Sequence, residues 1–119
     1  MSDKSNEENE DLKEKISQIF LHCNFELPKE DIVCSQLDEL FKTSEIKKVL
    51  TDDDLIKTTD LFFENNLNIS STSKAGFMHR NTLIYRINKI KHLTGLDIRN
   101  FNEASVFKNL VNAYKKLHF

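Results

Sequence analysis

Residues 68–97 read NISSTSKAGFMHRNTLIYRINKIKHLTGLD, and this stretch decides the fold. A short Ser- and Thr-rich segment is followed by a break at Gly76-Phe77-Met78 and by an amphipathic segment from Arg80 to Leu93. The outer face expected for the second segment carries Arg, Asn, Thr, Tyr and Lys, which donate hydrogen bonds. Two short helices of this kind, joined by a tight turn, predict a helix-turn-helix that fits the major groove of DNA.

Helical spacing sorts the second of these helices into two faces. At about 100° per residue, one stripe is expected to be buried and consists of Leu83, Ile87, Ile90 and Thr94. The opposite face is polar and carries Asn81, Tyr85, Asn88 and His92, with Ile84 and Lys89 at its edges. An ordinary surface helix usually carries Glu as well as Lys, but no acidic residue occurs between positions 79 and 96. We expect Gly95 to end the helix as a C-cap.

The same stretch resembles the C-terminal helix-turn-helix of PucR/CdaR-type bacterial regulators, which activate purine catabolism and sugar-diacid use. The signature of that family runs roughly H-R-N-T-L-x-Y-R-L-x-x-I, followed by T-G-L-D. The matching residues are His79, Arg80, Asn81, Thr82, Leu83, Tyr85, Arg86, Ile90, Thr94, Gly95, Leu96 and Asp97, with Ile87 in place of Leu. A weaker similarity extends from about Asp53 to the C-terminus. The resemblance implies an all-α fold, a small helical bundle that contains a helix-turn-helix of the Fis-like type.

Two positions depart from the family pattern in the first short helix, for which Ser70 is the expected cap. Ser73 stands where a small Ala is usual, and Gly76 stands where a core Leu is usual. Losing that Leu removes a buried apolar side chain, and Gly lowers helix propensity. Each of these changes costs about 1 kcal/mol or more of stability. We expect Phe77 or Met78 to move inward and fill the gap.

Charge is divided sharply along the chain, although the net charge of the whole is only −2. Residues 1–66 carry 17 Asp and Glu against 8 Lys and Arg, a net charge of −9. Residues 67–119 carry 2 acids against 9 bases, a net charge of +7. A basic segment of this kind attracts polyphosphate, and an acidic neighbour limits non-specific binding.

The remainder of the chain also has the composition of a helical protein, with only two Gly and one Pro in 119 residues. We expect a disordered acidic tail over 1–8, a helical lead-in region over 9–50 and the helix-turn-helix domain over 51–119. Within the lead-in, apolar spacing predicts a helix from about Asn9 to His22, a break at Pro28, a second helix through Phe41, and a helical turn over 44–50.

Two further helices are expected on either side of the helix-turn-helix. Thr51 is the expected cap of a supporting helix that reaches Asn65-Asn66, with the acids of positions 52–54 at its positive end. Those acids could alternatively bind a metal ion, although they lack the spacing of a calcium loop. Asn102 is the expected cap of the last helix. Its apolar stripe is wide enough to suggest pairing with a second subunit through Phe107, Tyr114 and Leu117.

The donors near the start of the second helix are the candidate base readers. Arg80 can bind guanine or a phosphate, Asn81 can bridge adenine, and Ile84 can touch a thymine methyl group. The remaining DNA-binding candidates, mainly phosphate contacts, are Thr82, Tyr85, Asn88, Lys89, Lys91, Ser70 and Lys74. Arg86 could contact DNA or bridge to the supporting helix. His79 is favoured as a helix cap over a base contact.

No nucleophile–base pair, Gly-rich phosphate loop or metal-ligand spacing occurs in the sequence, so we expect neither an enzyme nor a cofactor. Cys23 and Cys34 match no zinc or redox spacing and are expected to be reduced thiols, with a metal site at His22, Cys23 and Cys34 as the lesser alternative. No apolar run approaches the length of a membrane span, and no signal peptide opens the chain, so a cytoplasmic protein is expected.

The expected partners are double-stranded DNA and a second copy of the chain. A protein-interaction or dimerisation module that has lost DNA binding is the alternative, and Ser73 and Gly76 are its support. In the resembled family a sensor region usually precedes this domain. The chain is therefore either a C-terminal piece of a longer regulator or a small stand-alone factor.

Overall fold

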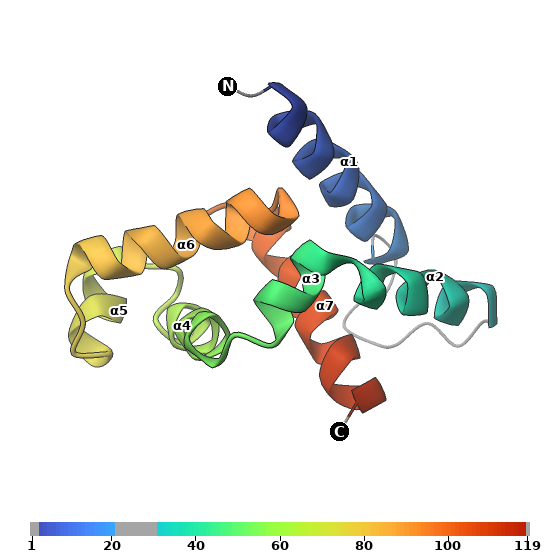
Figure 1. The fold of residues 1–119 in the computed structure, drawn as a ribbon. Helices are drawn as coiled ribbons and strands as arrows, with labels where there is room; N and C mark the ends of the chain where they lie inside the picture. The colour runs from blue at the N-terminus through green and yellow to red at the C-terminus, as the bar shows by residue number, and fades with distance from the viewer. Residues whose placement is uncertain (1–2, 21–30, 119) are drawn as a thin grey trace.

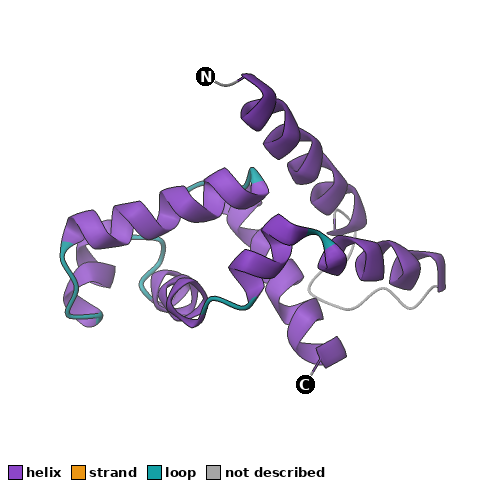
Figure 2. Cartoon of the chain, in the orientation of Figure 1, coloured by secondary structure: helices purple, strands orange, loops and turns teal. Residues whose placement is uncertain are grey.

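The computed structural model describes residues 3–20 and 31–118, which form helices and contain no strand (Figures 1 and 2). In chain order the helices are α1 (Asp3–Phe20), α2 (Asp31–Lys42), α3 (Ser44–Leu50), α4 (Asp53–Glu64), α5 (Ile69–Ala75), α6 (Arg80–Thr94) and α7 (Phe101–His118). The fold is all-α, as the sequence predicted. The residues discussed for a metal site, His22 and Cys23, lie outside the described part, as do Pro28 and the side chain of Cys34.

Helix α6 is the centre of the arrangement, because it packs against α1, α3, α4 and α5. In Figure 1, α5 lies beneath the end of α6 where the helix begins, α4 lies beneath its middle, and α3 lies near its other end. The shared interior explains this position. Ile87 and Ile90 of α6 are fully buried, and the core around them includes Ile16 of α1, Ile46 of α3 and Phe62 of α4.

One hydrophobic core therefore connects the predicted lead-in region with the predicted helix-turn-helix region. Apolar side chains from both sides of residue 50 belong to the same buried cluster. Because α1 packs on both α6 and α7, burying its apolar stripe stabilises the helices that follow residue 50. The division of the chain between residues 50 and 51 remains a prediction from the expected helix start at Thr51 and from the family resemblance.

Helix α1 begins earlier than the sequence analysis expected. The structure has helix from Asp3 onward, whereas the sequence predicted a disordered tail over 1–8 and a helix start near Asn9. The segment from Asp3 to Phe20 contains neither Gly nor Pro, so nothing in it interrupts the backbone hydrogen bonding of the helix. Apolar periodicity does not detect such a polar extension, because it marks only the part of a helix that packs on a core.

The cap of α4 is Asp52 and not Thr51, which corrects the sequence prediction. The Asp52 side chain accepts a hydrogen bond from the Leu55 backbone N–H at 3.2 Å. Thr51 is used by the preceding helix, since its N–H and its hydroxyl both donate to the Lys47 carbonyl. Only two residues separate the two helices, and Thr51 closes α3 while Asp52 opens α4.

The start of α7 also differs from the prediction, and its apolar stripe is largely used inside the chain. The Asn100 side chain accepts from the Glu103 N–H at 3.1 Å, so the cap lies two residues before the predicted Asn102. Phe107 is fully buried, and the ring of Tyr114 meets Phe41 edge-on with centroids 5.5 Å apart. Only Leu117, at 46% exposure, lies open among the residues proposed for a second subunit. The apolar surface expected to be left over is therefore mostly covered by α2 and the core.

Candidate nucleic-acid interface

The helix-turn-helix consists of α5, a tight turn and α6. Helix α5 is capped by Asn68, whose side-chain oxygen accepts from the Ser71 N–H at 2.8 Å, and not by Ser70 as the sequence predicted. Asn68 is the better cap here because it lies outside the helix with extended backbone angles, whereas Ser70 is already in the first turn. Ser70 and Lys74 are both exposed on α5, and α5 packs against α6.

The turn between the two helices depends on Gly76 and Phe77. A Cβ atom on Gly76 would lie 2.6 Å from Leu61 Cδ2 and 2.8 Å from Met78 Cε, so these two side chains occupy the space next to the glycine. The expectation that Met78 fills the gap is therefore correct, and Leu61 of α4 assists it. Phe77 does not move inward: it is 97% exposed and has a positive φ of 51°.

Helix α6 has the two faces that the spacing predicted. Its predicted inner stripe is buried and consists of Leu83, Ile87, Ile90 and Thr94. Its predicted outer face is exposed and consists of Asn81, Tyr85, Asn88 and His92. The helix begins at the predicted cap, because His79 Nδ1 accepts from the Asn81 N–H at 3.0 Å, and it ends at Gly95 in the left-handed conformation with φ 80°.

The candidate base readers lie near the first turn of α6. Arg80 and Asn81 are exposed, and Tyr85 follows one turn later with 64% of its surface exposed. Thr82 and Ile84 are half-buried at the edges of this face. The structure thus gathers these five residues on one end of α6, where a recognition helix enters a groove.

Arg86 points in the other direction. Its Nη1 donates a hydrogen bond to the hydroxyl of Thr58 on α4 at 3.0 Å, and Thr58 is buried. The sequence left two roles open for Arg86, a contact with DNA and a bridge to the supporting helix. In the structure Arg86 forms the bridge. The partner is a hydroxyl group, although acidic side chains are common in α4.

The lysines of α6 face carboxylates of their own chain. Lys89 Nζ lies 3.7 Å from Asp52 Oδ2, the side chain that caps α4, and Lys91 Nζ lies 4.0 Å from Asp97 Oδ2. In the part of the chain that the structure describes, the acids of positions 52–54 do not form a group that could hold a metal ion, and Asp52 is engaged as a cap and an ion-pair partner. Both lysine side chains remain substantially exposed, so they can still reach an external phosphate.

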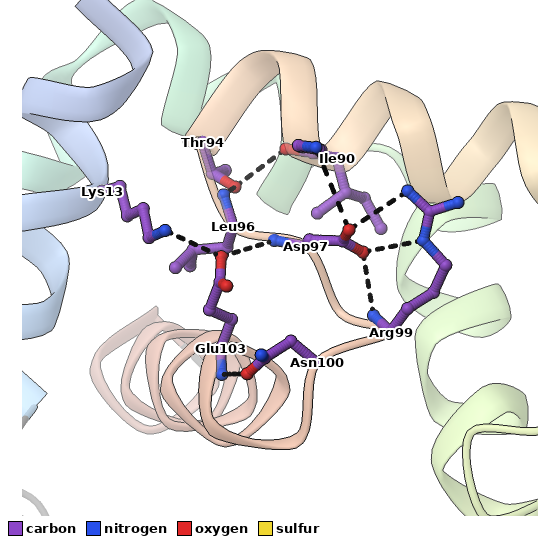
Figure 3. Close-up of polar contacts among 9 residues, drawn as sticks. Lys13, Ile90, Thr94, Leu96, Asp97, Arg99, Asn100 and Glu103 are labelled. Atoms are coloured by element: carbon purple, nitrogen blue, oxygen red, sulfur yellow. Dashed lines mark hydrogen bonds and ion pairs between the residues drawn. The ribbon is translucent and has the colours of Figure 1, made fainter.

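The segment Thr94-Gly95-Leu96-Asp97 is a structured loop that leads from α6 into α7 (Figure 3). The Thr94 hydroxyl donates to the Ile90 carbonyl at 2.8 Å and accepts from the Leu96 N–H at 3.1 Å. The Asp97 N–H donates to Glu103 Oε1 at 3.0 Å, and Lys13 of α1 lies 3.2 Å from the same oxygen. The loop is therefore held by α1, α6 and α7 together.

Arg99 contacts the candidate residue Asn88 and was not among the candidates named from the sequence. Its Nε and Nη2 donate to the two carboxylate oxygens of Asp97 at 2.9 and 3.1 Å, and Nη2 also donates to Asn88 Oδ1 of α6 at 3.1 Å. Helical periodicity could not find this residue because it lies in a loop after α6. The only available signal was that Arg99 is one of the nine bases after residue 66.

The charges of this cluster reinforce one another. Burial raises the pKa of Asp97, but hydrogen bonds from Arg99, together with the charges of Arg99 and Lys91, bring that pKa below its ordinary value. The hydrogen bond with Asp97 raises the pKa of Arg99 above its ordinary value. Asp97 therefore stays ionised and holds the guanidinium in place over a wide range of pH.

Residues 55–108 match the PucR C-terminal helix-turn-helix domain family. Over 69 residues the chain is 42% identical to the carbohydrate diacid regulator of Escherichia coli strain K12, a match that covers 57% of this chain and 18% of that protein. It is 34% identical over 73 residues to the purine catabolism regulatory protein of Bacillus subtilis strain 168, covering 61% of this chain and 13% of that protein. It is 35% identical over 64 residues to the proline-responsive transcriptional activator PutR of the same strain, covering 53% and 16%.

These matches confirm the predicted resemblance, and the family match lies within residues 55–108. The matched region spans less than a fifth of each of these relatives. No solved structure matches the chain. Among the residues that the structure describes, no helix is both long enough and apolar enough to cross a membrane.

Proposed function

Because residues 55–108 form a PucR-type C-terminal helix-turn-helix domain, we propose that the chain binds double-stranded DNA sequence-specifically as part of a bacterial transcriptional regulator. In this proposal α6 is the recognition helix and enters the major groove with its first turns. The observation that carries the proposal is the exposed face of α6, where Arg80, Asn81 and Tyr85 lie together on a helix that contains no acidic residue.

The side chains of this face divide into readers and positioning contacts. Asn81 suits a bidentate contact with adenine, and Arg80 suits guanine O6 and N7, because each pairing matches the donors and acceptors of one base edge. Ile84 suits a thymine methyl group. Thr82 and Tyr85 lie beside these readers and suit phosphate oxygens, which fix the register of the protein on the duplex.

Phosphate contacts are also proposed for exposed side chains around this face. Ser70 and Lys74 lie on α5, which packs against α6 and would run close to the DNA backbone. Lys89 and Lys91 follow the readers along α6 and would contact phosphates there. Each lysine would either leave its carboxylate partner or keep it while binding the phosphate. Arg86 is excluded from this set because its guanidinium is bonded to Thr58.

A homodimer on a two-fold site is part of the proposal, since one helix-turn-helix reads few base pairs. We also propose a cytoplasmic location and, because the relatives are much longer, a sensor region in a longer parent protein. The proposed role is binding and not catalysis, and it requires no cofactor. Selected binding sites should be inverted repeats with a fixed spacing, and sites without dyad symmetry would contradict the dimer.

A protein-interaction module that has lost DNA binding is the second candidate. Its support was the loss of a core Leu at Gly76, which could have changed the angle between α5 and α6. Leu61 and Met78 occupy the space beside Gly76, and Thr72 of α5 is fully buried. This packing favours a helix-turn-helix of ordinary shape, so we prefer DNA binding.

The experiment is a titration of the full chain with labelled duplexes selected from a random pool, repeated at several salt concentrations. Affinity should fall as salt rises, with a log–log slope of about −0.9 per phosphate neutralised. Arg80→Glu should weaken binding strongly. Lys47→Glu, the matched control, makes a similar charge change on an exposed residue of α3 and should have little effect. A salt-independent affinity, or no binding to any duplex at low salt, would refute the proposal.

A further inference from the structure

Asn88 and Arg99 are joined by a hydrogen bond, and neither residue is among the proposed base readers. Asn88 lies on the exposed face of α6, and Arg99 reaches it from the loop after the helix. Asp97 fixes the guanidinium with two hydrogen bonds and also accepts from the Arg99 backbone N–H at 3.0 Å. Figure 3 shows Asp97 and Arg99 facing each other across this loop.

The contact with Arg99 determines what Asn88 can offer to a ligand. An Asn side chain has an acceptor oxygen and a donor NH2 group, and adenine recognition uses both. Here the oxygen accepts from Arg99 Nη2, and the adjacent positive charge disfavours a second donor such as the adenine amino group. Within the described residues, Asn88 Nδ2 has no hydrogen-bond partner, so the outward group of Asn88 is a donor.

Arg99 adds donors of the same kind. Its Nε and Nη2 are engaged by Asp97 and Asn88, whereas Nη1 has no partner among the described residues. The Arg99 side chain is 39% exposed, so this end of the guanidinium is accessible. The two side chains together therefore present only donors, beside a positive charge.

Position on α6 places this pair away from the first readers. Asn88 follows Arg80 by eight residues, which corresponds to about 12 Å along the helix axis. Asn88 lies on nearly the same side of the helix as Asn81, because seven residues make about two turns. A helix that inserts its first turn into the major groove would bring Asn88 to the next part of the DNA surface on the same side.

We propose that Asn88 and Arg99 form a donor-only subsite for a hydrogen-bond acceptor of DNA, either the O6 and N7 edge of a guanine or a phosphate oxygen. Arg99 is the positioning residue that fixes the Asn88 amide, and Asp97 in turn fixes Arg99. The proposal rests on the proposed function, because it assumes that α6 faces a duplex.

The experiment compares wild-type full chain with Arg99→Met, Arg99→Lys and Asn88→Asp. Each protein is used in selection from random duplexes, in affinity measurements over a salt series and in thermal unfolding. Asn88→Asp keeps an acceptor for Arg99 but removes the outward donor, so we expect an affinity loss of about tenfold or more. Asn112→Asp on α7 is the matched control, since it makes the same charge change outside the subsite, and should leave affinity within about twofold.

The Arg99 variants distinguish the two ligand sources. If the acceptor is a guanine edge, Arg99→Met frees the amide oxygen, and one position of the selected site should change from guanine to tolerate adenine. Arg99→Lys should do the same with an unchanged salt slope, because Lys keeps the charge but lacks the planar fork. If the acceptor is a phosphate, Arg99→Met should reduce the salt slope by about 1 without changing any base preference.

Other results would overturn the subsite. If Arg99→Met matches the wild type in affinity, base preference and salt slope, Arg99 does not act on DNA. A lower melting temperature with a uniform affinity loss, at unchanged base preference and slope, would show a structural role only. Failure of the wild-type chain to bind any duplex would instead refute the proposed function itself. This outcome is distinguishable from failure of the subsite because it is measured on the wild-type chain alone.

Discussion

Arg86 Nη1 lies 3.0 Å from the hydroxyl oxygen of Thr58, and this hydrogen bond joins α6 to α4. Thr58 is 1% exposed, so the bond is formed at the edge of the core and away from solvent. An arginine on a helix proposed to bind DNA thus acts inside the protein. It fixes α6 on α4, and so it helps to set the orientation of the proposed readers Arg80 and Asn81 relative to the rest of the molecule.

Replacement of Arg86 by Met should therefore reduce stability without changing DNA recognition directly. Arg86→Met leaves a buried hydroxyl without its partner, which should cost about 1 to 2 kcal/mol in the free energy of unfolding. Adding Thr58→Val should recover part of the loss, because neither polar group then remains. Denaturant unfolding of the two single variants and the double variant measures the coupling. Additive losses, or a salt slope of DNA binding lowered by Arg86→Met, would contradict this role.

A substitution in the turn between α5 and α6 should raise stability instead of lowering it. Phe77 has φ 51° and is almost fully exposed, so its side chain has little packing to lose. Phe77→Gly should relieve the cost of a left-handed bulky residue, about 1 to 2 kcal/mol, against about 0.5 to 1 kcal/mol of added chain entropy. A small gain in melting temperature is expected. Phe101→Gly, at another exposed Phe but in the first turn of α7, should lower the melting temperature, and equal effects of both changes would refute the backbone argument.

Acid should weaken the protein through Asp97. The pKa of Asp97 is lowered in the folded state, so its carboxylate contributes stability above the unfolded value near 4, and this contribution is lost as pH falls through the folded pKa. Asp97→Asn should lower stability at pH 7 by about 2 kcal/mol, since charge-assisted hydrogen bonds are lost. Well below pH 4 the difference between variant and wild type should shrink.

Thermal unfolding at pH 7, 5 and 3 checks the Asp97 prediction. Glu64→Gln is the control, because Glu64 is an exposed acid in the last turn of α4 without an ion pair among the described residues. Its effect should stay within about 0.5 kcal/mol at pH 7. A deficit of Asp97→Asn that is the same at pH 7 and pH 3 would mean that the carboxylate charge is not what stabilises the loop.

Periodicity predicted α6 well, because a helix buried on one side repeats its apolar residues at a spacing that a sequence displays. Leu83, Ile87 and Ile90 are buried, and His79 and Gly95 bound the helix as expected. The cap predictions failed where several polar residues compete. Asp52, Asn68 and Asn100 are the caps, and the sequence analysis chose a neighbouring Thr, Ser or Asn in each case.

Long-range partners were the other part that the sequence could not supply. The bond from Arg99 to Asn88 joins residues 11 positions apart across the end of a helix, and Lys89 pairs with Asp52, the cap of a different helix. Such contacts depend on how helices cross, which a single sequence does not encode in any local pattern. The candidate residues on α6 could be named from their spacing, whereas the intramolecular partners that limit their chemistry could not.

Substitutions of Asn81 and Lys89 should separate base reading from positioning. Asn81→Ala should relax base preference at one position of the selected site and weaken that site by about 1 to 3 kcal/mol. Lys89→Ala should weaken specific and random duplexes nearly equally and lower the salt slope by about 1. Affinities for both kinds of duplex across a salt series provide the measurement. If both variants weaken specific and random DNA in the same ratio, the proposed division of roles is wrong.

Removal of the Asp52 charge should strengthen DNA binding. Asp52 lies 3.7 Å from Lys89 and competes with any phosphate that this lysine would contact. Asp52→Asn keeps the cap of α4, because Asn and Asp cap helices about equally well, but it releases the lysine. Stability should therefore change by only about 0.5 kcal/mol, while affinity for every duplex should rise a few-fold at low salt and less at high salt. Asp54→Asn is the matched control: it removes the same charge from an exposed neighbour in the first turn of α4, which has no ion pair among the described residues. An equal gain from both variants would indicate a general effect of net charge, and no gain from Asp52→Asn would show that Lys89 does not contact phosphate.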